Sequence, residues 1–335
     1  MTLEDLALLS RRGRMRMVVL IIALAVGVVW AAAHFLQPAP PRRIVLASGP
    51  EDGLYHRHAQ RYIEILRRAG VTVEERMTHG AGENLGLLLD ANSGVDIALT
   101  QGGVARFPEA DGLVMLASLY YEPLWIFYRG ADALTQVNQL RGLRTSIGIE
   151  GSGTRALALA VLAANGLTSD KVTLFAMDND IALRALQSGE IDAAMFVAGT
   201  QSPAVWKALH DPNLKLMSLK RADAYPRRFT YLNKLTLPPG AIDLSLNIPV
   251  QEVALIGTKA MLAARDGLHP ALINLLTDAA REIHGAPGYF EEAGEFPGTT
   301  HVDLRVSAEA DRHRRFGPSF LYRYLPFWWP PLWSG

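Results

Sequence analysis

The sequence predicts an α/β protein of two lobes, each a mixed, mostly parallel sheet flanked by helices, after an N-terminal transmembrane helix. Three observations support this prediction. Strand and helix patterns alternate along residues 43–103 and again along residues 143–199, as is typical of parallel strands covered by helices. The two stretches share several local details, as an internal repeat would. A largely apolar run without a formally charged residue covers Met17–Leu36.

Composition limits the functions that the chain can have. Its 335 residues suffice for two domains, and a content of 49% hydrophobic and 20% charged residues is that of a globular protein. The 33 basic and 33 acidic residues cancel, so no overall positive field points to nucleic acid, and we expect no such partner. The lack of cysteine excludes disulfides, thiolate metal sites and a cysteine nucleophile.

The N-terminal segment has the pattern of a membrane anchor. Four arginines at residues 11–16 precede Met17–Leu36, which has no formally charged residue and about the 20 residues that a helix needs to cross a bilayer. The basic flank predicts that residues 1–16 stay in the cytoplasm and that the rest is exported. A signal peptide cleaved near Ala31 and a buried core helix are the alternatives. The proline-rich residues 37–43 then form a stiff linker.

Residues 43–103 predict the first strand–helix unit. Arg43–Gly49 has the pattern of a strand that ends in a polar turn, and the helix after it places its apolar side chains on one face. That face consists of Tyr55, Ala59, Tyr62, Ile63 and Leu66. A second strand begins at Val71. The leucine-bearing helix that follows is expected to end at Ser93-Gly94, where glycine suits a left-handed C-cap.

Residues 143–199 repeat this order. Leu143–Gly151 has the pattern of a strand, and the turn at Ser152 leads into a long apolar helix. A strand at Val172 and a helix ending at Ser188-Gly189 follow. An aspartate then precedes an apolar strand that ends at glycine, as in the first unit. These shared details favour a true repeat over the general similarity of two strand–helix–strand units.

The remaining segments connect and complete the two units. Ser118–Gly130 is an aromatic, strand-like crossover, and the proline-rich stretch Tyr225–Pro249 is irregular. Glu252–Arg265 predicts another strand. Pro270–Gly285 predicts a helix, with proline at its start and glycine at its end. We expect these last elements to return to the first lobe.

The domain boundaries follow from this reading. Lobe 1 is predicted to hold residues 44–122 and 254–315, and lobe 2 to hold residues 123–253. The tail Phe316–Gly335 is rich in aromatic residues and proline, which suits a membrane interface. Packing of this tail against the fold is the alternative.

Six polar loops define the candidate site. In open α/β sheets, ligands bind beyond the carboxyl ends of the strands, and two facing sets of such loops form a cleft that can close by hinge motion. The loops are Ser48–Tyr55, Thr78–Asn84, Thr100–Gly103, Glu150–Thr154, Met177–Ile181 and Ala198–Gln201. A glycine-rich turn that opens a helix, as at Gly151–Thr154, suits an anion. A nucleotide phosphate, a catalytic serine and a ligand carboxylate are the competing explanations.

The motifs of known reaction centres do not match. No Gly-Lys pair follows the turn, so it is not a P-loop, and the residues around Ser152 do not form a nucleophile elbow. We expect Ser152 to cap its helix. The pair His56 and His58 lacks further metal ligands, so a solvated helix start is favoured. The pair Asp178 and Asp180 is expected to cap a helix. The sequence therefore predicts a binding cleft with no catalytic residue, metal or cofactor.

Six motifs follow one another in a fixed order along residues 42–285. They are Ala47–Tyr55, Thr78–Leu85, Asp96–Gln101, Tyr121–Leu124, Gly148–Thr154 and Asp192–Gly199. Together they resemble the TAXI-type extracytoplasmic solute-binding proteins of tripartite ATP-independent periplasmic (TRAP) transport systems.

This resemblance implies a function. The chain would have a two-lobed, type II-like periplasmic-binding-protein fold. The protein would bind a solute and would not be an enzyme. Such a protein closes on a small anionic solute, a glutamate-like amino acid or a dicarboxylate, and passes it to TRAP-type permease subunits. The binding domain would lie on the periplasmic side of the bacterial inner membrane. The resemblance places a solute carboxylate on the Gly151–Thr154 turn. The implied binding residues are Ser48, Gly53, Tyr55, Thr78, Gly80, Asn84, Gln101, Glu122, Gly151, Ser152, Gly153, Thr154 and Gly199.

The chain also departs from the family's pattern. Pro50-Glu51-Asp52 replaces a flexible glycine motif, and its carboxylates either face solvent or select a ligand that bears an ammonium group. His56 and His79 replace an aromatic residue and a glycine, and both are expected to line the cleft and make binding sensitive to pH. A tethered solute sensor that signals to a membrane partner is the alternative function.

Overall fold

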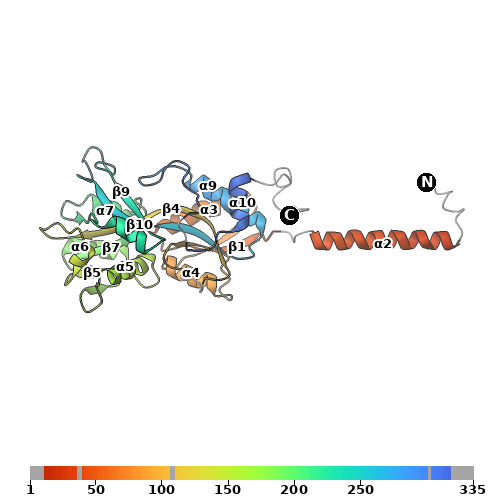
Figure 1. The fold of residues 1–335 in the computed structure, drawn as a ribbon, viewed down its shortest axis with the longest axis horizontal. Helices are drawn as coiled ribbons and strands as arrows, with labels where there is room; N and C mark the ends of the chain where they lie inside the picture. Colours follow the sequence, from red (N-terminus) through yellow and green to blue (C-terminus); the bar gives the residue numbers. More distant parts are fainter. Residues whose placement is uncertain (1–10, 36–39, 106–109, 301–302, 318–335) are drawn as a thin grey trace. The chain divides into compact units, whose positions relative to one another are not determined.

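The computed structural model describes residues 11–35, 40–105, 110–300 and 303–317 (Figure 1). It divides into two units, which we describe separately. In the first, the helix α2 covers Arg11–Phe35. The second is a body over Pro41–Gly317 that holds the remaining described elements.

The N-terminal helix exists as predicted. No helix among the described residues is long and apolar enough to cross a membrane. The predicted span over residues 17–36 and the inner-membrane anchor stay predictions. The helix stops at Phe35, and residues 36–39 lie outside the described part of the chain. Residues 318–335 of the predicted aromatic tail lie outside it as well.

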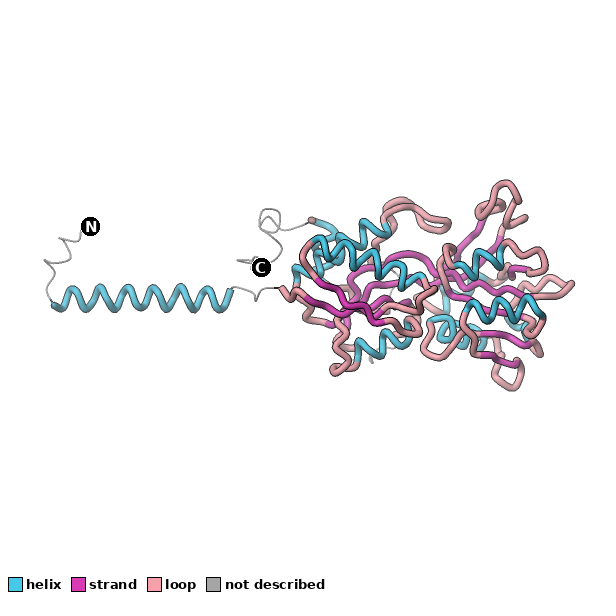
Figure 2. Tube along the Cα trace, turned by 180° about the vertical axis from the view of Figure 1, so that it is seen from behind, coloured by secondary structure: helices cyan, strands magenta, loops and turns pink. Residues whose placement is uncertain are grey.

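The body is built on one mixed sheet of 10 strands (Figure 2). In sheet order, eight of them are β2 (Thr72–Arg76), β1 (Arg43–Ala47), β3 (Ile97–Gln101), β10 (Val253–Arg265), β4 (Leu113–Tyr128), β7 (Ala193–Val197), β5 (Arg144–Ser146) and β6 (Thr173–Phe175). Two short strands complete it, β8 (Lys215–Leu216) on β4 and β9 (Asn233–Leu237) on β10. The sets β2–β1–β3 and β6–β5–β7 are parallel, whereas β4 and β10 run antiparallel to their neighbours. This confirms the predicted mixed sheets.

Two long strands connect the halves of the sheet. β4 pairs with β10 up to Pro123 and with β7 from Leu124 onward. We call the part built on β1, β2 and β3 lobe 1, and the part built on β5, β6 and β7 lobe 2. The lobe limits near residues 122 and 254 stay a prediction, which this change of partner supports.

Helices cover both lobes. Those of lobe 1 are α3 (Leu54–Arg68), α4 (Ala81–Leu89), α9 (Pro270–His284) and α10 (Ala308–Phe316). Those of lobe 2 are α5 (Gly153–Ala164), α6 (Asn179–Ser188) and α7 (Pro203–Leu209), with the short α8 (Tyr225–Arg228), η1 (Val137–Leu140) and η2 (Ala222–Ala224). Figure 1 shows α9 and α10 beside α3, and α9 contacts both. The last elements of the body thus return to lobe 1, as expected from the sequence.

Most local signals act as predicted, with one exception. The apolar face of α3 is buried apart from Ile63, which is partly exposed. Gly189 caps α6 in the left-handed conformation, with φ of 80°. The matching prediction for Gly94 is wrong, because α4 already ends at Leu89. The Asp90 side chain accepts the N–H of Asn92 at 2.9 Å and turns the chain there, and Gly94 lies in the loop beyond.

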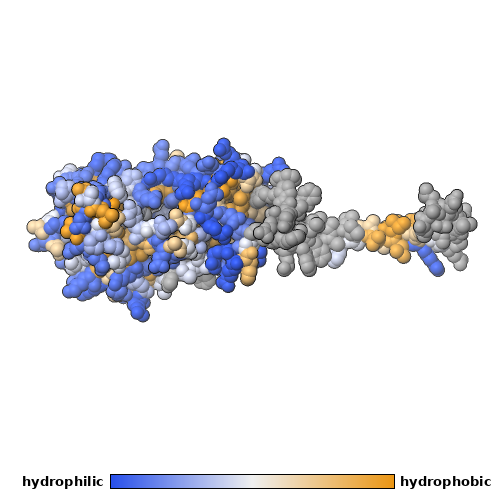
Figure 3. Space-filling view, turned by 90° about the horizontal axis from the view of Figure 1, so that it is seen from above, coloured by the Kyte–Doolittle hydropathy of each residue, from blue (hydrophilic) through white to orange (hydrophobic). Residues whose placement is uncertain are grey.

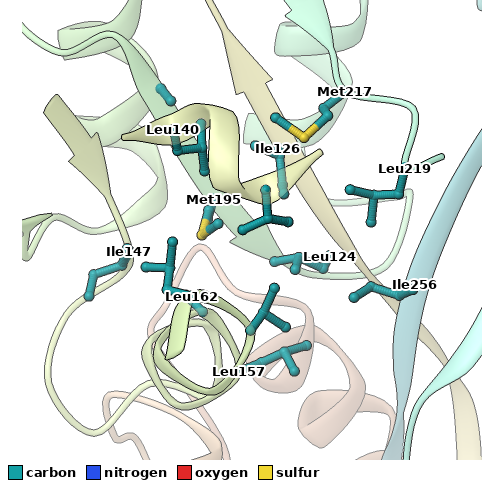
Figure 4. Packing of buried hydrophobic residues seen from close by; sticks show 14 of the residues in the cluster. Leu124, Ile126, Leu140, Ile147, Leu157, Leu162, Met195, Met217, Leu219 and Ile256 are labelled. Carbon is teal, nitrogen blue, oxygen red and sulfur yellow. The ribbon is translucent and has the colours of Figure 1, made fainter. Parts of the chain in front are cut away.

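Successive side chains of β4 point to opposite faces of the sheet, and they contribute to two apolar layers in lobe 2. Leu124 and Ile126 point to one face and pack against Leu157 and Leu162 of α5 (Figure 4). The intervening side chains, with Trp125 among them, point to the other face and pack against α6 and α7. The sheet is therefore buried on both faces and holds the ends of its strands in fixed positions. Polar residues cover most of the face of the body seen in Figure 3.

Candidate functional site

A pocket lies between the lobes at the loops that the sequence singled out. All six loops contribute lining residues, and the pocket encloses about 860 Å³ of space, part of it open to solvent. Eight of the predicted binding residues line it: Gly53, Tyr55, Gly80, Gln101, Glu122, Ser152, Gly153 and Thr154.

Besides the seven-residue helix α7, four helices begin at this pocket. The first residues of α3, α4, α5 and α6 are Leu54, Ala81, Gly153 and Asn179, and each of them lines the pocket. N–H groups in the first turn of a helix have no acceptor within the helix, and the helix dipole adds partial positive charge there. The pocket is therefore favourable for an anionic group even without a basic side chain.

Ser152 holds the start of α5 in place. Its hydroxyl accepts the N–H of Arg155 at 3.2 Å and donates to the carbonyl of Ile149 at 2.7 Å. The hydroxyl proton thus lies on a backbone carbonyl, which confirms Ser152 as the N-cap of the helix. Thr154 fixes the same turn to β7, because its Oγ1 accepts the N–H of Val197 at 3.1 Å.

Glu122 is the buried acid of the pocket. Only 4% of the residue is exposed, and burial raises the pKa of its carboxyl to about 8, although the hydrogen bond with Tyr55 acts in the opposite direction. The Tyr55 hydroxyl lies 2.9 Å from Oε2 of Glu122 and 3.0 Å from the carbonyl of Thr100. Burial also raises the pKa of Tyr55, and the charge of Glu122 adds to that effect. At neutral pH, Glu122 is therefore mostly uncharged.

The other titratable groups around the pocket are mainly acidic. Asp52, Asp178 and Asp180 line it together with His79. No lysine or arginine is among the described residues that do so. Asp178 caps α6, as predicted, by accepting the N–H of Ile181 at 2.8 Å. A carboxylate in this pocket would have to rest on helix N-termini, whereas an ammonium group would meet acidic side chains.

Three predicted binding residues lie beneath the pocket and do not line it. Asn84 is buried, donates to the carbonyls of Ser48 and Leu99, and accepts the hydroxyl of Thr78 at 2.6 Å. Ser48 donates its own hydroxyl to Glu75 at 2.5 Å. These hydrogen bonds join the loops of lobe 1, and a role of the three residues in binding stays a prediction.

Gly151 and Gly199 do not line the pocket either. Both lie where another segment of the chain comes close to the backbone. The Gly151 carbonyl accepts the N–H of Glu83 from α4 at 3.1 Å. A side chain on Gly199 would come within 2.9 Å of Leu54. The amide of Gln101 also donates to the carbonyl of Gly153 at 3.1 Å. Backbone and side-chain bonds thus cross directly between the lobes, and the structure is a closed arrangement.

The histidines differ in their surroundings. His79 lines the pocket, with Nδ1 2.7 Å from Glu83, but His56 turns to Glu75 at 2.9 Å and does not line it. His58 is not at a solvated helix start as predicted, because α9 covers it and His284 packs on its ring. Burial lowers the pKa of His58 to about 4. Within the described ranges, no group of three or more acidic or histidine side chains is placed to hold a metal ion.

Sequence reasoning missed part of the lining. Ser202, Pro203 and Ala204, at the start of α7, line the pocket next to the predicted Ala198–Gln201 loop. The signal was present, because serine followed by proline is a common helix start. Gly148 and Ile149, directly before the predicted loop Glu150–Thr154, were also missed as lining residues.

Two α/β lobes that are joined by two long strands and closed over a pocket define a periplasmic-type solute-binding fold. The chain belongs to the NMT1-like family, whose model matches residues 47–292.

Three solved structures are similar to this chain at low identity. A protein of Bordetella bronchiseptica RB50 is 15% identical with a TM-score of 0.50, over 74% of this chain and 72% of that one. The periplasmic aliphatic sulphonate binding protein SsuA from Escherichia coli is 17% identical with a TM-score of 0.48, over 73% of each chain. The alkanesulfonate-binding protein SsuA from Xanthomonas axonopodis pv. citri, bound to MOPS, is 15% identical with a TM-score of 0.48, over 73% and 74%.

Proposed function

We propose that the chain is an extracytoplasmic solute-binding protein that captures a small carboxylate-bearing solute between its lobes and performs no reaction on it. One observation carries the proposal: four helix N-termini converge on a pocket that inter-lobe hydrogen bonds close. The solute carboxylate would bind at the start of α5, where Gly153 and Thr154 line the pocket. Gln101 and Tyr55 would form the opposite wall.

The charges of the lining favour a glutamate-like amino acid over a dicarboxylate. A second carboxylate would meet Asp52, Asp178 or Asp180, with no basic side chain among the described lining residues to offset the repulsion. An ammonium group would be attracted by the same side chains. A zwitterionic solute therefore matches both the helix N-termini and the acidic side chains.

We further propose that the chain delivers its solute to TRAP-type permease subunits, as the TAXI-type motifs imply. This proposal is supported by the position of the motifs that define the resemblance, because three of them lie at the pocket. The Ala47–Tyr55, Thr78–Leu85 and Gly148–Thr154 motifs all supply residues of the pocket. The closed arrangement of the lobes is also what a protein that carries a solute requires.

A ligand screen tests this function. Purified full-length protein would be heated with amino acids, dicarboxylates, oxo-acids, cationic amines and neutral sugars. A solute at 100 times its dissociation constant stabilises the native state by about 2.7 kcal/mol, which a thermal-shift assay detects. We expect the largest shift from an acidic amino acid. Stabilisation only by cationic amines or sugars would contradict the proposal.

A further inference from the structure

The hydroxyl of Tyr55 is placed between two oxygen atoms that normally accept hydrogen bonds. Its Oη lies 3.0 Å from the Thr100 carbonyl and 2.9 Å from Oε2 of Glu122. A phenol has a single proton to donate. If Glu122 is protonated, both contacts are full hydrogen bonds, because Glu122 then donates to Tyr55 while Tyr55 donates to Thr100. Together with the burial of Glu122, this geometry favours the uncharged acid.

Among the described residues that line the pocket with Glu122, none is a lysine or an arginine that would hold a negative charge there. From α3 it faces Tyr55, and from β4 the buried Tyr120 lies close enough for the two groups to influence each other's charge. From β10, Thr258 is its strand partner and donates to the carbonyl of Gly102 at 2.9 Å.

Two basic residues on the neighbouring elements α3 and β10 have other partners. Lys259 lies over the ring of Tyr121, which alternation along β4 places on the opposite face of the strand from Glu122. Arg57 donates to the carbonyl of Gln201 at 3.2 Å. The remaining charged or titratable side chains that line the pocket are Asp52, His79, Asp178 and Asp180.

We propose that Glu122 selects the charge of the solute: it is an uncharged acid in the pocket, and a solute carboxylate binds only while Glu122 keeps its proton. This inference rests on the proposed function and names the residue that sets its specificity. Glu122 directly precedes Pro123, the residue of β4 after which the pairing passes from β10 to β7 of lobe 2. Its charge is thus placed where the lobes meet around the solute.

The proposal predicts a dependence of affinity on pH with a definite sign. Below the pKa of about 8, Glu122 is neutral and binding of the solute carboxylate is at full strength. Above that pKa, binding must first restore the proton, so the affinity falls about tenfold between pH 7 and pH 9. A solute held by an ammonium group at Glu122 would show the opposite trend.

The experiment measures the affinity of full-length wild type and of Glu122→Gln by calorimetric titration at pH 7 and pH 9. The two ligands are L-glutamate and the carboxylate that gives the largest shift in the thermal-shift screen. Glutamine stays neutral and its amide can donate to Tyr55, so we expect the variant to bind equally well at both pH values. Glu64→Gln is the matched control, because Glu64 is exposed on α3, and it should keep the wild-type pH profile. Equal affinity of the wild type at pH 7 and pH 9 would overturn the inference.

An infrared measurement tests the protonation without any solute. The difference spectrum between wild type and Glu122→Gln at pH 6.5 should contain the band of a protonated carboxyl group. A carboxylate band instead would overturn the inference even if a solute carboxylate binds. Failure of every carboxylate to bind, with the protonated band present, would refute the proposed function and leave the uncharged acid established.

Discussion

The closed arrangement depends on a glycine of α4 that faces the other lobe. A Cβ atom on Gly82 would lie 2.8 Å from the carbonyl oxygen of Gly151. Ordinary contacts of a Cβ atom begin near 3.4 Å, and the opposing atom belongs to the backbone, so it has no side-chain freedom with which to move away. Gly82→Ala should therefore push the lobes apart by several tenths of an ångström.

The energetic effect follows from the bonds between the lobes. The N–H of Glu83 donates to the same Gly151 carbonyl at 3.1 Å, and Gln101 donates to Gly153 at 3.1 Å. Each such bond contributes about 1 kcal/mol, so losing one or both weakens solute binding by roughly five- to thirtyfold. Each lobe should keep its fold, because alanine favours a helix over glycine by up to about 1 kcal/mol.

The assay is the dissociation constant of the strongest solute from the screen, measured beside thermal unfolding. Gly86→Ala is the matched control, because Gly86 lies in the same helix and a Cβ atom there meets nothing within 4 Å. We expect both variants to keep their melting temperature and only Gly82→Ala to lose affinity. Equal solute affinity of the two variants would show that solute binding does not depend on the close contact between Gly82 and Gly151.

Two further substitutions separate binding from folding. Ser152→Asp should keep the melting temperature, because aspartate also caps helices well. It should lower the solute affinity by more than about tenfold, since it adds a negative charge at the start of α5. Tight binding of the solute by this variant, measured by calorimetry, would exclude a carboxylate at that position. Tyr62→Phe should raise the free energy of unfolding by about 1 kcal/mol, because the buried Tyr62 hydroxyl has no hydrogen-bond partner among the described residues. Denaturant unfolding measures the second effect, and a loss of stability would mean that the hydroxyl has a partner in solution.

The sequence predicted the fold well because its signals are local. Strand and helix alternation, the caps at Ser152 and Gly189, and the proline at the start of α9 each depend on a few neighbouring residues. The glycine at Gly94 shows the limit, because a left-handed glycine in a loop has the same local pattern as one that ends a helix.

The site was harder to predict because side-chain direction depends on distant elements. The sequence places Asn84 at the end of a polar loop, but it lies in α4, where its amide donates inward to the carbonyls of Ser48 and Leu99. His58 follows two polar positions of a helix start, and its burial comes from α9, more than two hundred residues later in the chain. The acidity of the pocket likewise arises from residues that only the closed lobes bring together.

The central claim is that a solute carboxylate binds at the start of α5. A crystal structure of the full-length chain with the strongest solute of the screen tests it most directly. Our account predicts a carboxylate oxygen within hydrogen-bond distance of the N–H groups of Gly153 and Thr154, with Glu122 at the other side of the solute. A solute whose carboxylate points away from α5, or one that occupies the pocket without a carboxylate, would contradict it.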